Sequence, residues 1–143
     1  MKKKFIIMII SLVNLNLCAQ EKYLKDVHET QQLSQQIVEL FSKNKISQSF
    51  NQLALYWPLP ESEIEQIKDK TIKYLNIVEQ RFGKSIGILK VKNEAISDIA
   101  IRETYLIRYE ITAIRVMFTY YKGNNGWIIN TFKWDDAFTE EFK

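Results

Sequence analysis

Cysteine and histidine are nearly absent from the sequence, which has one of each among 143 residues. Cys18 lies in the apolar N-terminal stretch, so the remaining chain offers no disulfide, no thiolate nucleophile and no cysteine ligand for a metal. His28 is followed by Glu29, and a histidine–carboxylate pair could do acid–base chemistry. Because no triad or metal partner accompanies it in the sequence, we interpret His28 as a surface residue on a polar helical turn.

An excess of charge is also absent once the N-terminus is set aside. The whole chain has 20 Lys and Arg against 17 Asp and Glu, a net charge of +3. Lys2, Lys3 and Lys4 account for the difference, so the chain without them has 17 residues of each sign. No cluster of Lys or Arg remains, and nucleic-acid binding requires a basic footprint. We therefore expect no nucleic-acid partner.

The first 19 residues have the three parts of a secretory signal. The three lysines form a positive segment, residues 5–13 are apolar except for Ser11, and Ala19 provides a small residue for cleavage. The apolar run is shorter than the roughly 20 residues that a membrane-spanning helix needs. We therefore expect cleavage near Ala19 or Gln20, a mature chain without a transmembrane span, and a periplasmic or secreted protein.

A lipoprotein signal is the alternative that Cys18 raises, because such a signal ends at a cysteine that becomes lipidated. That recognition requires a small residue immediately before the cysteine, and Leu17 stands there. The match is poor, and we expect no anchoring at Cys18. Residues 20–143 then form the mature protein, whose length is typical of a single domain. Without a disulfide, the hydrophobic core alone must hold that domain together.

Catalytic and metal-binding motifs are missing as well. The sequence contains no P-loop, no GxSxG, no HExxH and no paired-carboxylate motif. Asp135 and Asp136 are adjacent and could contact a cation, but a metal site needs several oxygen ligands. We interpret them as the N-cap of a C-terminal helical turn. The sequence thus favours a non-catalytic protein without a metal or a cofactor.

Apolar residues recur every three or four positions in the first half of the mature chain, which predicts helices. The first helix spans residues 21–44 and the second spans residues 47–55, before two prolines end it. Ser62 and Glu65 have the spacing of a capping box, in which each side chain bonds the amide of the other residue. The third helix then runs to Phe82, and Gly83 stands where a C-cap glycine belongs.

Beyond Gly83 the pattern changes to a period of two, which predicts strands. We expect them at four places along the chain, residues 85–93, 101–110, 114–122 and 127–134. A tight turn near residues 110–113 is predicted because the apolar positions there change parity. The Gly-Asn-Asn-Gly loop at 123–126 is typical of a hairpin. Three N-terminal helices packed on an antiparallel sheet of about four strands make an α+β domain.

This order of elements resembles the nuclear transport factor 2 fold, also called the cystatin-like or cone-shaped fold, and especially its small exported members from Bacteroidetes-type bacteria. The similarity is carried by YWPLPESEIEQIKDKTIKYL, by RFGKSIG and by YLIRYEITAIRVMFTYYKGNNGWIINTFKWDD. These motifs are structural rather than catalytic. The resemblance implies a curved sheet wrapped around the helices, with a conical pocket between them. Because such folds host many unrelated activities, it implies no particular function.

The pocket that the resemblance implies directs attention to the aromatic residues. Alternation in the last strand predicts two faces, with Trp127, Ile129, Thr131 and Lys133 on one and Ile128, Asn130, Phe132 and Trp134 on the other. Both faces carry large apolar groups, which most often form core. If one face lines a pocket, the candidate ligand-binding residues are five aromatic side chains and one arginine: Trp57, Tyr105, Arg108, Tyr109, Trp127 and Trp134.

Arg108 is the candidate cationic anchor, since a guanidinium binds carboxylates and aromatic faces. The alternative role of Arg108 is a cross-strand ion pair with Glu103 or Glu110.

An apolar pocket with one cation would suit an amphipathic carboxylate. We therefore expect an exported, non-catalytic module that binds a small amphipathic ligand or a protein partner. Two alternatives stay open. One is a small isomerase, dehydratase or hydrolase with its acid–base group among Glu103, Tyr105, Tyr109 and Glu110, and the other is a structural homodimer formed through the sheet.

Overall fold

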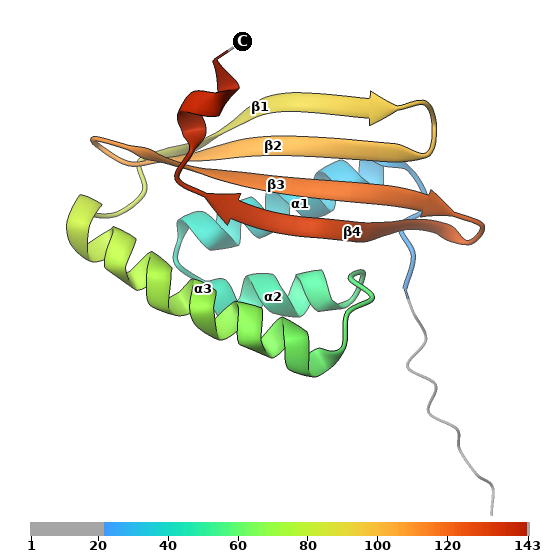
Figure 1. The fold of residues 1–143 in the computed structure, drawn as a ribbon, viewed down its shortest axis with the longest axis horizontal. Coiled ribbons are helices and arrows are strands. Elements are labelled where there is room, and N and C mark those ends of the chain that lie inside the picture. The colour runs from blue at the N-terminus through green and yellow to red at the C-terminus, as the bar shows by residue number, and fades with distance from the viewer. Residues whose placement is uncertain (1–21, 143) are drawn as a thin grey trace, which may run out of the picture.

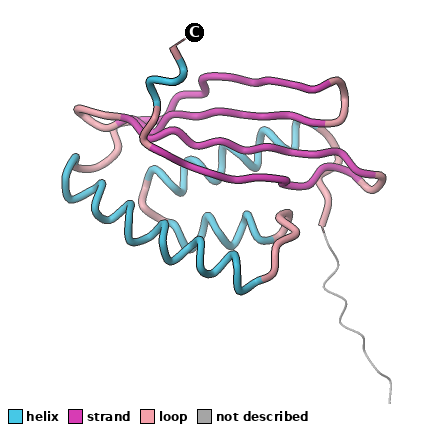
Figure 2. Tube along the Cα trace, in the orientation of Figure 1, coloured by secondary structure: helices cyan, strands magenta, loops and turns pink. Residues whose placement is uncertain are grey.

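The computed structural model describes residues 22–142, which form three helices followed by a four-stranded antiparallel sheet (Figure 1, Figure 2). The predicted α+β class is therefore confirmed. The strands pair in chain order, β1-β2-β3-β4, so the sheet is a meander without a crossover. The predicted signal segment and its cleavage site lie outside the described residues.

Helix α1 (Val27–Ser42) begins later than predicted because the chain before it pairs with the sheet. Leu24 forms an antiparallel bridge with Trp127, with backbone hydrogen bonds of 2.9 and 2.8 Å. Asp26 is the N-cap, and its Oδ1 accepts a hydrogen bond from the Glu29 amide at 2.9 Å. This bond satisfies one of the first-turn amides that have no partner within a helix.

Helix α2 (Ile46–Ala54) and helix α3 (Glu61–Phe82) lie close to the predicted positions. The predicted capping box is wrong, however, because α3 begins before Ser62, with Pro60 as N-cap and no side-chain cap bond. Proline is well suited to this position, since its missing N–H falls where amides lack an intrahelical partner. Helix α3 is followed by Gly83, whose φ of +79° is one that glycine adopts readily.

The four strands are β1 (Gly87–Ile96), β2 (Ala100–Arg108), β3 (Ala113–Gly123) and β4 (Gly126–Asp135). They differ from the predicted strands at their ends only. The turn between β2 and β3 is closed by a hydrogen bond of 2.8 Å from the Tyr109 amide to the Thr112 carbonyl. The change of parity in the sequence is therefore a tight turn, as predicted.

A β-bulge in β4 corrects the predicted faces of that strand. Thr119 of β3 pairs with Thr131, whereas the next residue, Tyr120, pairs with Ile129, so Asn130 is the extra residue. A bulge of this kind reverses the alternation of side chains partway along a strand. One face of β4 therefore carries all four of its large inward side chains: Trp127, Ile129, Phe132 and Trp134. Strict alternation had wrongly divided these residues between two faces.

Helix α1 lies against one face of the sheet, which we call the inner face, and the short 3-10 helix η1 (Phe138–Glu141) lies on the opposite, outer face (Figure 1). Helices α2 and α3 continue the helical layer past the β4 edge. Phe132 is the centre of the aromatic core. Its ring centroid lies 5.2–6.0 Å from those of four other core residues, Phe41, Phe50, Trp57 and Phe118.

Gly126 is a position in the hairpin where a side chain has no room. Its φ is +134°, and a Cβ there would lie 2.6 Å from the Leu24 carbonyl oxygen. Gly126→Ala is expected to lower the free energy of unfolding by about 1–3 kcal/mol, because it adds backbone strain to a clash with the bridging segment. Urea unfolding followed by circular dichroism measures the change.

Gly123→Ala is the matched control for this prediction. Gly123 is not among the residues with positive φ, and a Cβ there would meet only the Gly126 carbonyl oxygen at 4.0 Å. The control should change stability by less than about 0.5 kcal/mol. Equal losses from the two substitutions would contradict the idea that the Leu24 bridge restricts Gly126.

Candidate functional site

The six residues predicted to bind a ligand lie in different parts of the molecule. Trp57 and Tyr105 are buried in the core. Trp57 packs edge-on against Phe132 and Tyr105 packs edge-on against Phe118, with ring centroids 6.0 Å apart in both pairs. Contacts of this kind stabilise the interior. The structure therefore places these two aromatic residues in the core between the helices and the sheet.

Arg108 lies on the outer face of the sheet. It follows Ile107, which is fully buried on the inner face, and successive residues of a strand point to opposite faces. Arg108 is exposed, and among residues 22–142 it forms no ion pair. The cross-strand pair is instead made by Arg102, whose Nε lies 2.9 Å from Glu94 Oε2. The structure does not bring Arg108 together with the aromatic candidates.

Tyr109 and Trp127 line two smaller clefts near the two ends of α1. Tyr109 is in the wall of a cleft of about 350 Å³ beside Lys43 and Glu79. Burial, and secondarily the Glu79 charge, raise the pKa of the Tyr109 phenol, which is therefore a neutral hydrogen-bond donor. Trp127 is in the wall of a cleft of about 380 Å³ that also includes Lys122.

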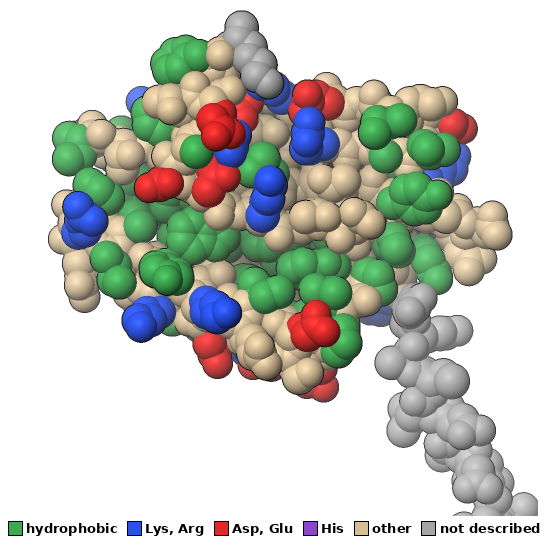
Figure 3. All heavy atoms as spheres, viewed as in Figure 1, with side chains coloured by type: hydrophobic (Ala, Val, Ile, Leu, Met, Phe, Trp, Pro, Cys, Tyr) green, Lys and Arg blue, Asp and Glu red, His purple; other side chains and the backbone are tan. Residues whose placement is uncertain are grey.

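Trp134 lines a larger groove between α3 and the ends of β3 and β4. The groove has a volume of about 670 Å³, within the range of small-molecule sites, roughly 300–1,000 Å³. Trp134 Nε1 donates a hydrogen bond to Thr71 Oγ1 at 3.2 Å, and its ring lies edge-on to Tyr74. These contacts hold the indole in one orientation. Figure 3 shows an apolar band along this junction between the sheet and α3.

One side of α3 forms the opposite wall of the groove. Lys70, Tyr74, Ile77 and Arg81 recur at spacings of three and four, which places them on the same side of the helix, and all four line the groove. Tyr74 and Ile77 are exposed. Within residues 22–142 neither Lys70 nor Arg81 forms an ion pair. We call these two cations the α3 rim; the sequence signal that points to them is this second helical stripe.

Asp135 and Asp136 line the sheet side of the groove. The Asp135 carboxylate is bound in bidentate fashion by Arg115, with Nε–Oδ1 and Nη2–Oδ2 distances of 3.0 and 2.7 Å. It also accepts a hydrogen bond from the Ala137 amide at 3.0 Å. The predicted N-cap role is thus corrected in detail. The N-cap residue of η1 is Ala137, which makes no side-chain cap bond, and the Asp135 carboxylate binds the amide of Ala137 itself.

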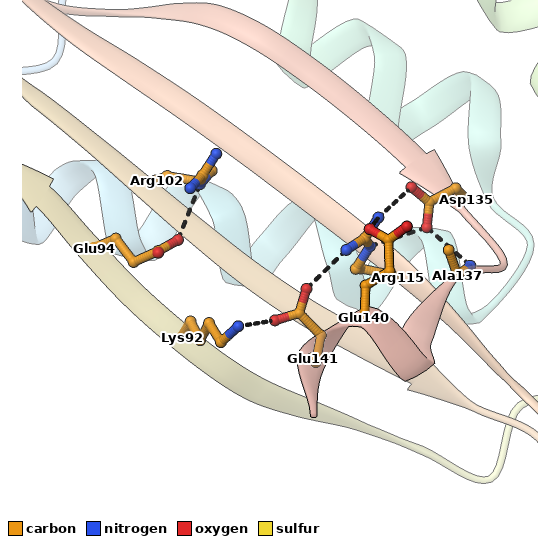
Figure 4. Close-up of polar contacts among 8 residues, drawn as sticks. All are labelled: Lys92, Glu94, Arg102, Arg115, Asp135, Ala137, Glu140 and Glu141. Carbon is orange, nitrogen blue, oxygen red and sulfur yellow. Dashed lines mark hydrogen bonds and ion pairs between the residues drawn. The ribbon is translucent and has the colours of Figure 1, made fainter. Parts of the chain in front are cut away.

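Arg115 is the centre of an ion-pair cluster that fastens η1 to the outer face (Figure 4). Besides Asp135, its guanidinium contacts Glu141 at 2.8 Å and Glu140 at 3.0 Å. Lys92 of β1 reaches the other oxygen of Glu141, with Nζ–Oε2 at 2.5 Å. The Arg115 bonds lower the pKa of Asp135, and the Lys92 and Arg115 bonds lower the pKa of Glu141. Both carboxylates are therefore held in the charged form.

A buried polar chain connects α1 with β2 and β3. Ser34, Glu103 and Tyr120 are each 0% exposed. Ser34 Oγ donates a short hydrogen bond to Glu103 Oε2 and lies 2.6 Å from the Tyr120 hydroxyl. Because serine has a single proton to donate, Tyr120 must donate to Ser34, which makes a directed chain from Tyr120 through Ser34 to Glu103. Burial raises the pKa of Tyr120, so the phenol keeps its proton.

Lys90 completes the environment of Glu103. Its Nζ lies 3.4 Å from Glu103 Oε1 and 5.8 Å from the centre of the Tyr105 ring. Glu103 was the candidate acid–base group most deeply placed on the inner face, and a general base must reach its substrate. With no exposed surface and both oxygens engaged, Glu103 is arranged to anchor α1 to the sheet. This geometry does not favour catalysis at Glu103.

In residues 22–142, no group of three His, Cys, Asp or Glu side chains is arranged to hold a metal ion. None of the helices in this part of the chain combines the length and the apolar character needed to cross a bilayer.

Comparison with protein-family models, with curated proteins and with solved structures found no match for this chain. The resemblance to the nuclear transport factor 2 fold therefore stays a prediction.

Proposed function

We propose that the protein is a non-catalytic binding module, exported as the sequence predicts, whose site is the groove between α3 and the β3–β4 ends. The observation that carries the proposal is the combination of a groove of about 670 Å³ with apolar walls and an uncompensated cationic rim. Sites for small molecules combine apolar walls with a few placed polar groups in this way. The ligand we propose is an amphipathic carboxylate.

The charges of the groove support this class of ligand. Lys70 and Arg81 stand along one wall and form no ion pair within residues 22–142. The other wall has two carboxylates, Asp135, which Arg115 binds, and Asp136. A carboxylate would gain a charge-assisted hydrogen bond from the α3 rim. The apolar body of the ligand would contact Trp134 and Ile77. The anchor proposed here is thus the α3 rim rather than Arg108.

Tryptophan fluorescence provides the test, with dodecanoate as the probe and dodecanol as its uncharged counterpart. We expect saturable quenching by dodecanoate that disappears in Trp134→Phe, because the other two tryptophans, Trp57 and Trp127, are buried elsewhere. Replacing both rim cations, Lys70→Gln with Arg81→Gln, should weaken dodecanoate binding by about two- to tenfold. Dodecanol binding should not respond to that double substitution.

Matched variants separate the groove from the general surface. Ile77→Glu places a carboxylate in the groove and should abolish dodecanoate binding. Leu55→Glu is the control, because Leu55 is exposed to the same extent, 41%, and does not line the groove. Absence of quenching, or quenching that Ile77→Glu and Leu55→Glu affect equally, would overturn the proposal.

A further inference from the structure

The outer face of the sheet carries an apolar row that is unrelated to the groove. The register places Ile96 opposite Ala100, Ala100 opposite Tyr121, and Tyr121 opposite Ile128. Side chains at directly paired positions lie on the same face, close enough to touch. These four residues therefore form a continuous line across all four strands, which we call the apolar row. Ile96 is 69% exposed and Tyr121 is 47% exposed.

Within residues 22–142, the chain covers the other half of this face. Helix η1 lies over the part of the outer face near Arg115, where the ion pairs with Glu140 and Glu141 fasten it. Met117, which also points outward, is buried there. Figure 3 shows the contrast: charged side chains gather where η1 lies, and apolar side chains gather at the end of the sheet with the β1–β2 and β3–β4 hairpins. An exposed apolar patch bordered by polar residues marks an interaction site.

The row next to it has charges that are complementary to themselves. It consists of Glu94, Arg102, Thr119 and Thr131, again in direct register, and the side chains of Glu94 and Arg102 are both about half exposed. In a contact with two-fold symmetry, if residue i of one copy meets residue j of the other, then residue j of the first copy also meets residue i of the second. A second copy can therefore place its Arg102 against Glu94 and its Glu94 against Arg102.

From these observations we infer that the apolar row is the centre of a two-fold contact between two copies of this chain, bordered by reciprocal Glu94–Arg102 ion pairs. The position of η1 limits the contact to the uncovered hairpin end of the sheet. The equal numbers of acidic and basic residues beyond the first four positions leave no net charge to oppose association. An anionic membrane or a nucleic acid would instead require an excess of Lys and Arg.

Sedimentation of the purified protein over a wide range of concentrations tests the apolar row. We expect a reversible monomer–dimer equilibrium in the unaltered protein. Ile96→Glu and Tyr121→Glu should each leave only the monomer, because a carboxylate would be buried in the contact. Ile111→Glu is the control: Ile111 is 78% exposed and lies in the turn at the other end of the sheet. It should dimerise like the unaltered protein.

Charge reversal tests the symmetry of the contact. Glu94→Arg alone and Arg102→Glu alone place like charges together across the two-fold axis and should be monomeric. An equimolar mixture of these two variants restores both ion pairs and should form a heterodimer. The inference is overturned by an unaltered protein that is monomeric at every concentration, by a dimer that the row substitutions leave intact, or by a mixture that stays monomeric. Circular dichroism of each variant separates loss of association from loss of folding.

Discussion

Glu103→Ala is expected to lower the free energy of unfolding by about 3–5 kcal/mol, the range for removal of one partner from a buried charged network. The substitution leaves the Ser34 hydroxyl without its acceptor, Lys90 without its carboxylate, and a cavity beneath α1. A buried polar group that loses its partner costs the full penalty of its desolvation. Urea unfolding with tryptophan fluorescence as the signal gives the size of the loss.

Two further variants distinguish the network from the charge alone. Glu103→Gln keeps the volume and an oxygen that can accept from Ser34, so it should destabilise the protein less than Glu103→Ala does. Glu110→Ala removes an exposed glutamate from the turn after β2 and should change stability by less than about 0.5 kcal/mol. If Glu103→Ala behaved like Glu110→Ala, the buried chain would have no structural role.

The Glu103 network also shows what local patterns could not predict. The sequence places Glu103 on the inward parity of β2, between Ile101 and Tyr105, where an apolar residue would be expected. Ser34, which binds Glu103, lies 69 positions away from it in the sequence. Tyr120, which binds Ser34, lies 86 positions away from that serine. Pairing over such sequence separations depends on how α1 crosses the sheet, and the spacing of apolar residues in the sequence does not show this. A carboxylate at an inward position therefore predicts that a polar partner binds it, but it does not identify the partner residue.

The fold class followed from the sequence because its signals are local and agree with one another. The change of apolar period after Gly83 marks the passage from helices to strands, and the Gly-Asn-Asn-Gly loop marks the last hairpin. The start of α1 was predicted too early because Leu24 continues the apolar stripe of the helix. In the structure that residue completes a bridge to Trp127, a tertiary contact that overrides the local pattern.

The candidate site was predicted less well than the fold. Trp134 does line the groove, but Arg108 does not, because its parity places it on the outer face. The α3 rim was missed because apolar spacing predicts a helix without showing that its exposed side, which includes Tyr74, lines a groove. Residues 70, 74, 77 and 81 form a second stripe at helical spacing, with a cation at each end. A helix with two such stripes has a second surface to cover.

The groove and the outer face meet at Arg115. Its partner Asp135 stands at the end of β4, where it contributes to the groove wall, and its partners Glu140 and Glu141 belong to η1 on the outer face. One buried guanidinium therefore fixes the shape of the groove wall and the position of η1. The groove and the outer face of the sheet therefore depend on the same side chain.

Arg115→Met is accordingly expected to lower the free energy of unfolding at neutral pH by about 2–4 kcal/mol. The upper end of this range is the cost of removing one partner from a fully buried ion pair. The expected cost is smaller here because the Glu140 side chain is 66% exposed and remains hydrated. Methionine fills much of the space of the arginine stem but leaves three carboxylates facing one another beside Lys92. Glu65→Gln is the control, since it removes the pair between Glu65 and Lys68 on the surface of α3, and such a pair contributes only about 0.2–1 kcal/mol.

The pH dependence of stability identifies the Arg115 cluster as the cause. The pKa values of Asp135 and Glu141 lie below their ordinary values of 3.8 and 4.5. The stability that these carboxylates contribute is therefore fully present at a pH above the ordinary pKa values, and it is lost as the pH falls through the lowered pKa values. The unaltered protein should therefore lose stability on acidification below about pH 5. Arg115→Met should show a flatter profile, because without the guanidinium the two carboxyl groups return toward ordinary pKa values. Urea unfolding at a series of acidic pH values measures both curves, and parallel curves would mean that Arg115 does not hold these carboxylates in their charged form.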